Sequence, residues 1–452
     1  MLGAALPAQE NAQIGPPDPL TLEAAVGFAG RNVPAVRASA ARASEAEVGI
    51  DLARTAYLPR ADMRLGVNRA TRNNVFGLIF PNSVIPGISG PVQEDSTFTS
   101  VFGTSAGVLF SYQPFDLGLR RANVRVAEAD AERAEASREV TEYEVALSVV
   151  VSYLQAVASQ IAMRAAEAGV ERMQVFHEIV GVLVASELRP GSDAARARAE
   201  LARVRSDLIR AEQLRNTALA TLAERLGLAG TAIEISPEGL LGEPPGVSPS
   251  GSSVDRHPFA AEQRAEVASR EARLAAIRKE WRPRFEAQSA VYGRGTGATI
   301  DGSFLGGAHG LAPSQANWAA GFSMTFDLLE YRSTRARQRI ESHRIERERA
   351  REAEVEQEIR GDVARAEIAL DAARRIAGNT PIELQAAQEL ETQERARYRA
   401  GLATVADVAD SQLLLRQAEV EHSLARMGVW RAMLALAAAQ GSLDELVAVA
   451  SR

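Results

Sequence analysis

The side chains that most often carry out catalysis are few in this chain and widely separated. There is no cysteine, which excludes thiolate nucleophiles, disulfide bonds and zinc–thiolate sites. The five histidines are scattered, without the i,i+4 pairing and adjacent glutamate that a helical zinc site requires. The glycines of residues 293–310 lie between two expected strands with no helix start behind them, unlike a phosphate-binding loop. We therefore expect no catalytic residue, no metal and no cofactor, and predict that the chain is not an enzyme.

Acidic side chains stand at the start of two expected helices. Asp407 and Asp410 are three residues apart, and Asp193 stands 214 residues before Asp407. The helix dipole stabilises negative charge at this position, so a solvated helix start is one interpretation. In the other, several copies of an acidic side chain around a narrow axis favour cations and repel anions. The residues alone leave both interpretations open.

Composition and charge narrow the class of protein. The chain is 46% hydrophobic and 24% charged, as in ordered proteins, and its net charge of −7 does not suggest a nucleic-acid partner. No uninterrupted apolar run reaches the ~18 residues of a membrane-spanning helix, so any part that crosses a bilayer should consist of β-strands. Residues 1–9 resemble either the end of a secretory signal without its positive start or an ordinary N-terminal tail.

Four segments alternate apolar and polar residues with period two, which predicts strands with one apolar and one wet face. Half-buried sheets and membrane barrels both give this pattern; lengths near ~10 residues and aromatic residues near the ends favour a barrel. Asp62 and Arg64 would then face the lumen. Four strands cannot close a barrel, which needs about eight, so several protomers must pool theirs. The apolar sets are Met63, Leu65 and Val67; Phe98, Phe102, Ala106, Val108, Phe110 and Tyr112; Phe285, Ala287, Ser289 and Val291; and Trp318, Ala320, Phe322, Met324 and Phe326.

A very long helical segment follows each pair of strands. Residues 119–186 contain no proline and would form a helix on the order of 100 Å long. Apolar residues recur every seven positions from Val126 to Val182, with one charged exception at Arg133, which predicts a coiled-coil seam along the whole helix. Helices of this length form coiled coils or tunnel walls.

The second long segment, residues 331–399, is interrupted by Gly-Asn-Thr-Pro. We expect a kink or a new helix start there, with Thr380 as the N-cap and Pro381 in the first helical position.

The chain is an internal duplication. Two prolines, Pro34 and Pro59, recur 224 residues later, and from Asp116 onward the offset falls to 214. The loops at 73–90 and 293–310 are expected to be extracellular. The predicted organisation is an N-terminal tail or signal remnant (1–19); a first repeat (20–229) with a helix, a β-hairpin (59–116), a long helix (119–186) and a helix (192–227); a surface linker rich in Gly, Pro and Ser (230–254); a second repeat (255–441) with a helix, a β-hairpin (283–328), a long helix (331–399) and a helix (404–440); and a C-terminal tail (442–452).

The turn after the second long helix carries the most specific motif. Residues 397–408 read Arg-Tyr-Arg-Ala-Gly-Leu-Ala-Thr-Val-Ala-Asp-Val, which resembles the Tyr-x-x-Gly-(Leu/Thr)-x-Thr-x-x-Asp-Val tip of the TolC-like outer-membrane factor family. Residues 187–193, Glu-Leu-Arg-Pro-Gly-Ser-Asp, are similar to the first tip of a subset of that family, with Glu187 where a glycine is usual. Together with the duplication and the paired strands, the resemblance covers essentially the whole chain.

The resemblance implies a mainly α fold with a β-barrel part: a trimeric α-helical periplasmic tunnel and a shared 12-stranded outer-membrane barrel. It implies an outer-membrane channel protomer of a tripartite efflux pump in a Gram-negative bacterium, which exports small molecules such as drugs or metals. The implied partners are two further copies of the chain, a periplasmic adaptor (membrane fusion) protein, an inner-membrane transporter and outer-membrane lipid. A type I protein-secretion duct remains an alternative. The long helices alone also fit a soluble periplasmic adaptor or scaffold, but the lipid-type strands and the duplication do not.

The resemblance also assigns roles to residues of the two turns. Ala403 stands where some members have an arginine that latches the closed channel, so the latch here is expected to differ. The implied pore constriction consists of Asp407 and Asp410, held by a network with Asp193 and Tyr398. The implied adaptor contacts are Leu188, Arg189, Gly401 and Leu402.

Overall fold

The structure, a computed structural model, describes residues 19–71, 98–242, 244, 254–297, 299 and 305–450. The signal-like residues 1–9, the loop at 73–90 and most of the Gly/Pro/Ser-rich linker lie outside these residues. The chain divides into two compact units, which are described separately. The first consists of Met1–Arg42, Glu135–Arg264 and Arg351–Arg452, and the second of Ala43–Ala134 and Ala265–Ala350.

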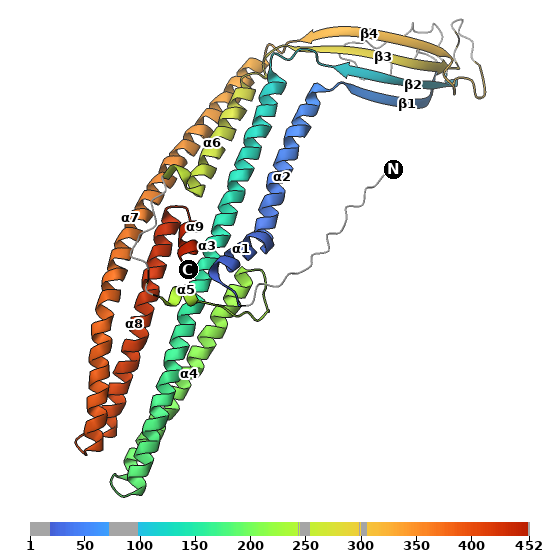
Figure 1. Ribbon diagram of the computed structural model, residues 1–452. Helices are drawn as coiled ribbons and strands as arrows, with labels where there is room; N and C mark the ends of the chain where they lie inside the picture. Colours follow the sequence, from blue (N-terminus) through green and yellow to red (C-terminus); the bar gives the residue numbers. More distant parts are fainter. Residues whose placement is uncertain are drawn as a thin grey trace. The chain divides into compact units, whose positions relative to one another are not determined.

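The described part is mainly helical, with four strands (Figure 1). Helices α4 and α8 both contain 35 residues, and each end of α8 lies 214 residues after the same end of α4. The predicted mainly α fold with a duplicated unit is therefore confirmed. In chain order the elements are α1 (Leu22–Asn32), α2 (Pro34–Arg54), η1 (Thr55–Tyr57), β1 (Arg60–Thr71), β2 (Ser100–Tyr112), α3 (Leu119–Ala185), α4 (Gly191–Arg225), α5 (Glu238–Leu241), η2 (Val254–Arg256), α6 (Pro258–Ile277), β3 (Arg284–Thr296), β4 (Gln315–Thr325), α7 (Glu330–Arg399), α8 (Val405–Ala439) and α9 (Asp444–Ala450).

The second unit holds one antiparallel sheet with strand order β1-β2-β3-β4. The two halves of the duplication meet where β2 pairs with β3, for example Val108 opposite Val291. Within the described sheet, β1 and β4 each pair with a single neighbour. The sheet is therefore open at both edges in one chain.

The two faces of the sheet differ as the alternation predicts. On one face, apolar side chains are largely exposed: Met63 70%, Leu65 72% and Trp318 79%. On the other face, Leu109 packs with Ala290 and Tyr292. Asp62 lies on this second side, in a hollow that Glu286 and Gln288 also line. A single chain thus leaves an apolar surface uncovered on one side and gathers polar groups on the other.

The main hydrophobic core lies in the first unit, where α1, α3, α4, α7, α8 and α9 come together. Trp430 of α8, Tyr153 of α3 and Leu222 of α4 are among its fully buried side chains. The Tyr153 hydroxyl donates to the carbonyl oxygens of Leu20 (3.0 Å) and Ser236 (2.8 Å). It thereby ties the chain segments before α1 and after α4 to the long helix.

The predicted first helix is two helices, because the chain turns at Val33. Pro34 has no N–H and disfavours a helical residue before it, and Val33 is extended with φ −64° and ψ 127°. In the second repeat, α6 likewise begins at a proline, Pro258. The single helix predicted at the start of the first repeat, before the β-hairpin, was therefore wrong in its continuity.

Of the predicted kink or new helix start at Thr380, the new start was wrong, because α7 continues through Pro381. A proline inside a helix leaves the carbonyl oxygen four residues earlier without its backbone donor. Here that oxygen belongs to Ala377, and the Thr380 hydroxyl donates to it at 3.2 Å. His422 Nδ1 of α8 lies 3.1 Å from the same hydroxyl. Thr380 thus supports the helix from within instead of capping it.

The seam predicted along α3 rotates away from the protein interior at its far end. Val150, Leu154 and Val157 are buried, but Val175 is 49% and Val182 67% exposed. A straight helix drifts by about 20° per heptad, which amounts to about 160° over the eight heptads from Val126 to Val182. The residues that pack in the distal part are instead Met173, Phe176 and Val180.

The predicted C-terminal tail and linker are partly built into the core. The tail forms α9, which buries Leu446 and Val447. In the linker, Ile235 forms a parallel β-bridge with Leu20. Leu240 is buried in the main core, so this segment does not only cross the surface. Ile235 and Leu240 lie in a segment that was predicted to be a surface linker because of its Gly, Pro and Ser content.

Helix α3 contains an 18-residue window with mean hydropathy 1.6, enough to cross a membrane by length and composition alone, and 44% of it is buried in the protein. This window differs from the expectation from sequence, because polar residues interrupt its apolar runs. Core helices of soluble proteins pass the same test, so this window is a weak indication of a membrane span.

Candidate functional site

The two turns that join the long and short helices have the same backbone geometry. After α3, the N–H groups of Glu187 and Leu188 donate to Val184 O (3.0 Å) and Leu183 O (2.9 Å). After α7, the equivalent donors are Gly401 and Leu402, with distances of 3.1 and 2.9 Å. This pair of bonds is a Schellman motif, which needs a left-handed residue after the helix.

Glu187 takes the conformation that glycine takes in the other turn. Its φ is 59°, against 81° for Gly401. The left-handed region costs a residue with a Cβ roughly 1–2 kcal/mol, so Glu187 is strained where Gly401 is not. Glutamate in place of the usual glycine therefore keeps the geometry of the turn but adds strain to it.

Asp407 caps the start of α8. Its carboxylate accepts hydrogen bonds from the backbone N–H (2.7 Å) and the hydroxyl (2.8 Å) of Thr404, and the Thr404 hydroxyl accepts from the Asp407 N–H (3.3 Å). This reciprocal arrangement is a capping box. The bonds from Thr404 hold the pKa of Asp407 below its ordinary value, and the positive charges of Arg397 and Arg196 lower it further.

Asp410 follows one turn later on α8, and both aspartates are exposed. Asp407 is thus a helix cap and an exposed negative charge at once, so the two interpretations of the acidic pair do not exclude each other.

Tyr398 connects the turns from inside the first unit. It is 1% exposed, its ring meets Phe176 of α3 edge to face at 5.4 Å, and its hydroxyl lies 3.4 Å from Asp193 Oδ2 at the start of α4. Burial raises the pKa of Tyr398, and the negative charge of Asp193 adds to this effect. The structure thus brings Tyr398 and Asp193 together and leaves Asp407 and Asp410 apart from that contact.

The four residues assigned to an adaptor contact differ in their surroundings. Leu188 and Leu402 are each 70% exposed and occupy equivalent positions of the two turns. Gly401 is exposed beside Leu402. Arg189 is only partly exposed, and its guanidinium donates to the carbonyl oxygens of Tyr398 (2.5 Å) and Ala403 (3.2 Å). Its polar atoms are therefore turned toward the protein itself.

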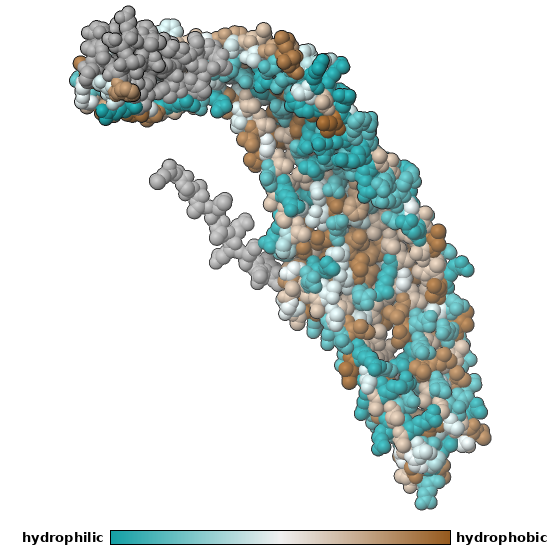
Figure 2. Space-filling model, turned by 180° about the vertical axis from the view of Figure 1, so that it is seen from behind, coloured by the Kyte–Doolittle hydropathy of each residue, from teal (hydrophilic) through white to brown (hydrophobic). Residues whose placement is uncertain are grey.

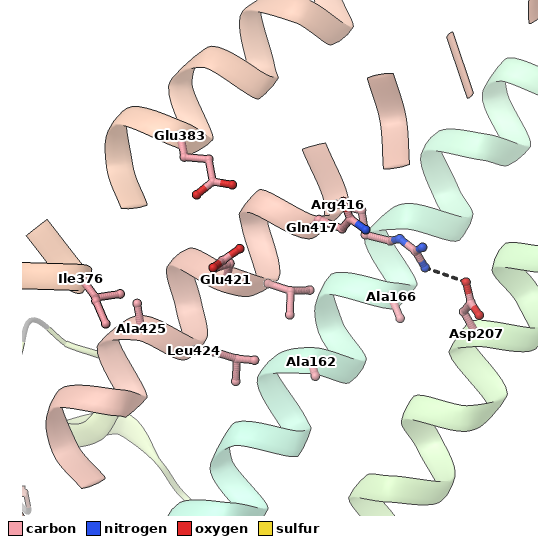
Figure 3. Close-up of a pocket in the computed structure, with 11 residues that line it drawn as sticks. Ala162, Ala166, Asp207, Ile376, Glu383, Arg416, Gln417, Glu421, Leu424 and Ala425 are labelled. Carbon is pink, nitrogen blue, oxygen red and sulfur yellow. Dashed lines mark hydrogen bonds and ion pairs between the residues drawn. The ribbon is translucent and has the colours of Figure 1, made fainter. Parts of the chain in front are cut away.

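Two ion pairs farther along the helices hold the α3–α4 and α7–α8 hairpins together. Arg172 of α3 meets Glu419 of α8 at 2.7 Å. Arg416 of α8 reaches past α3 to Asp207 of α4 at 2.8 Å, as Figure 3 shows. A Cβ at Gly169 would lie 3.3 Å from the Arg416 Cδ, so this glycine leaves room for the crossing side chain.

Arg416 and Asp207 line a groove of about 770 Å³ together with Ile376, Leu424 and other residues of α3, α7 and α8 (Figure 3). Sequence analysis missed these pairs, because their members are over two hundred residues apart and no motif marks them. Among the described residues, no group of three or more His, Asp or Glu side chains is placed to hold a metal ion.

Comparison with known proteins agrees with this architecture. The sequence profile of the family described as "Outer membrane efflux protein" matches residues 29–228 and 252–442, one stretch for each repeat. No curated protein matches the chain in sequence.

Solved structures show the same fold at low sequence identity. CusC, whose structures concern folding and transmembrane channel formation, aligns with a TM-score of 0.76 at 14% identity, over 93% of this chain and 92% of its own. The CmeC outer membrane channel of Campylobacter jejuni aligns with a TM-score of 0.73 at 14% identity, over 95% of this chain and 89% of its own. The outer membrane protein VceC of Vibrio cholerae aligns with a TM-score of 0.72 at 15% identity, over 93% of this chain and 96% of its own. With the family profile matching most of both repeats, the chain belongs to the outer membrane efflux protein family and is a protein of the outer membrane.

Proposed function

We propose that three copies of this chain form an exit duct, in which four strands from each copy close a twelve-stranded barrel in the outer membrane. The observation that carries this proposal is the four-stranded sheet with two open edges and an exposed apolar face. Four strands are too few to close, and an open edge invites further pairing. Membrane barrels place apolar residues toward lipid and polar residues toward the lumen.

The helices support the same assembly. Figure 2 shows hydrophobic residues on the surface of the long helices, interspersed with hydrophilic ones. On α7, Ile368 is 71% and Ile382 69% exposed. Neighbouring copies would cover such residues in a tunnel built from three chains. Reconstitution in planar bilayers tests the duct: the purified protein should give discrete conductance steps, and a trimeric preparation without steps would contradict it.

The duct is proposed to serve a tripartite pump that exports small molecules, with closure at the hairpin turns. Asp407 and Asp410 from three copies would form two acidic rings around the axis, which attract cations and repel anions. Because both side chains are exposed in one chain, they are available to line a pore.

The double substitution Asp407→Ala and Asp410→Ala should widen the closed pore and reduce its preference for cations. Single-channel conductance and reversal potentials in a salt gradient measure both effects. Conductance and selectivity that match the unsubstituted channel would contradict the acidic rings. Because Asp407→Ala also removes a helix cap, Thr404→Ala serves as the control that loses the cap and keeps the charge.

The periplasmic adaptor of the pump is proposed to dock on the turns, at Leu188, Gly401 and Leu402. Two equivalent leucines, each largely exposed, present similar apolar contacts from both repeats. Leu188→Asp with Leu402→Asp should abolish co-purification with the adaptor. Leu214→Asp, at a 65% exposed leucine of α4, is the matched control. Equal loss in the control would contradict a contact confined to the turns.

A further inference from the structure

One arginine lies on the apolar face of the sheet. Side chains alternate between the two faces along a strand, so Arg69 shares a face with Leu65, and it stands directly opposite Phe102 of β2. Within the four strands as the structure describes them, Arg69 is the single charged residue of this face. The other face carries charges of both signs, among them Asp62 and Glu286. A charge on a lipid-facing surface is costly near the middle of a bilayer and tolerated near its edge, so the depth of Arg69 matters.

The side chain of Arg69 is held by two neighbours. Its guanidinium carbon lies 5.0 Å from the centre of the Phe102 ring, and its Nε donates to the hydroxyl oxygen of Ser100 at 2.9 Å. The side chain is nevertheless exposed, and no described carboxylate forms an ion pair with it. The terminal nitrogens of the guanidinium and the Ser100 O–H therefore form a set of donors for one oxyanion.

A neighbouring loop indicates the depth at which Arg69 lies. The Thr104 hydroxyl, on the same face of the sheet, donates to Gly310 O at 2.5 Å. Irregular backbone does not face lipid hydrocarbon, so this contact marks the edge of the lipid-covered band. Thr104 stands opposite Val67, and Arg69 lies two residues farther toward the loop end of β1, about 7 Å along the strand. Arg69 thus lies just beyond the hydrocarbon, at the level of lipid headgroups.

We propose that Arg69, together with Ser100, binds the phosphate of a lipid in the outer leaflet of the outer membrane. This inference rests on the proposed function, in which the loop ends of the strands point out of the cell. Arginine suits phosphate because its planar fork donates two parallel hydrogen bonds. The acyl chains of the same lipid would cover Leu65 and Val67, which are 72% and 63% exposed. A free phosphate ion would match the guanidinium but leave this apolar surface uncovered.

The test titrates the trimer in detergent with bisphosphorylated lipid A and with the same lipid after removal of its phosphates, and counts bound lipids by native mass spectrometry. The unsubstituted protein should bind one phosphorylated lipid per chain, and should bind the dephosphorylated lipid at least about tenfold more weakly, because charged hydrogen bonds are lost. Arg69→Gln should bind the phosphorylated lipid about as weakly as the original protein binds the dephosphorylated one. Arg69→Lys should lie between the original protein and Arg69→Gln, since lysine keeps the charge but not the fork.

Arg64→Gln is the matched control. Arg64 is an exposed arginine of the same strand on the opposite face, so this variant loses the same charge and should bind both lipids as the original protein does. Equal affinity of Arg69→Gln and the original protein for the phosphorylated lipid overturns the site. An equal loss in Arg64→Gln also overturns it, because the charge of the whole sheet would then attract the lipid. Displacement of the lipid by excess inorganic phosphate would make the ligand a free ion and overturn the lipid.

Two further measurements separate this inference from assembly and from the duct. If Arg69→Gln does not assemble, the two lipids are compared on the unsubstituted protein and on Arg69→Lys. A preference for the phosphorylated lipid that lysine weakens supports the site, whereas no preference, or one that lysine leaves unchanged, overturns it. A conducting trimer that binds both lipids equally contradicts the lipid site alone. A preparation with neither trimer mass nor conductance steps contradicts the proposed function.

Discussion

Glu187 and Gly401 show how one backbone geometry can be built with and without strain. Both residues have positive φ in equivalent turns, but only glutamate carries a Cβ that this conformation disfavours. Glu187→Gly should therefore stabilise the folded protein by roughly 0.5–1 kcal/mol, after the greater freedom of glycine in the unfolded chain is deducted. Gly401→Ala should destabilise it. Thermal melting of the detergent-solubilised protein measures both, and a lower melting temperature for Glu187→Gly would argue against strain.

The capping role of Asp407 has a defined dependence on pH. The pKa of Asp407 is lowered in the folded protein, so its stabilisation is complete above the unfolded value of about 3.9 and is lost as pH falls through the folded value. The difference in melting temperature between the original protein and Asp407→Ala should thus stay constant from pH 7 to about pH 4 and shrink below it. Shrinkage between about pH 6 and pH 5 would mean that neighbouring carboxylates raise the pKa instead.

At the scale of elements, the continuity of α7 depends on a single hydroxyl. Because Thr380 supplies the donor that Pro381 lacks, Thr380→Val should cost about 1–2 kcal/mol by leaving the Ala377 carbonyl oxygen unpaired. In a Pro381→Ala background the backbone N–H returns, and the same substitution should cost less. Denaturant unfolding of the original protein, Thr380→Val, Pro381→Ala and the double variant gives the coupling free energy between the two positions. Equal costs in both backgrounds would show that the hydroxyl has no such role.

Periodic elements could be predicted from the sequence, whereas local exceptions could not. The strands around Leu65 and Trp318 were found because alternation is a property of neighbouring residues. The turn after α3 was predicted, but the left-handed conformation of Glu187 was not, since the motif places a glycine there. The path through Pro381 could not be predicted either, because the rescuing bond depends on a side-chain conformation. Arg416 meets Asp207 only after both hairpins have formed, so no local pattern indicates it.

At the scale of the whole molecule, the duplication explains why a single chain is incomplete. Each repeat contributes two strands and a helical hairpin, and the two strand pairs join at β2 and β3. The outer edges of β1 and β4 remain available, and proteins rarely leave such edges exposed because they promote aggregation. In the proposed assembly, closure with further copies would remove the edges, and lipid would then cover the apolar face that carries Met63, Leu65 and Trp318.

The central claim is that sister copies complete the barrel of each chain, and the native mass of the particle extracted from membranes tests it most directly. The protein should require detergent for extraction, and the mass after subtraction of bound detergent should equal three chains. A particle of one chain, released in soluble form without detergent, would contradict both the shared barrel and the acidic rings.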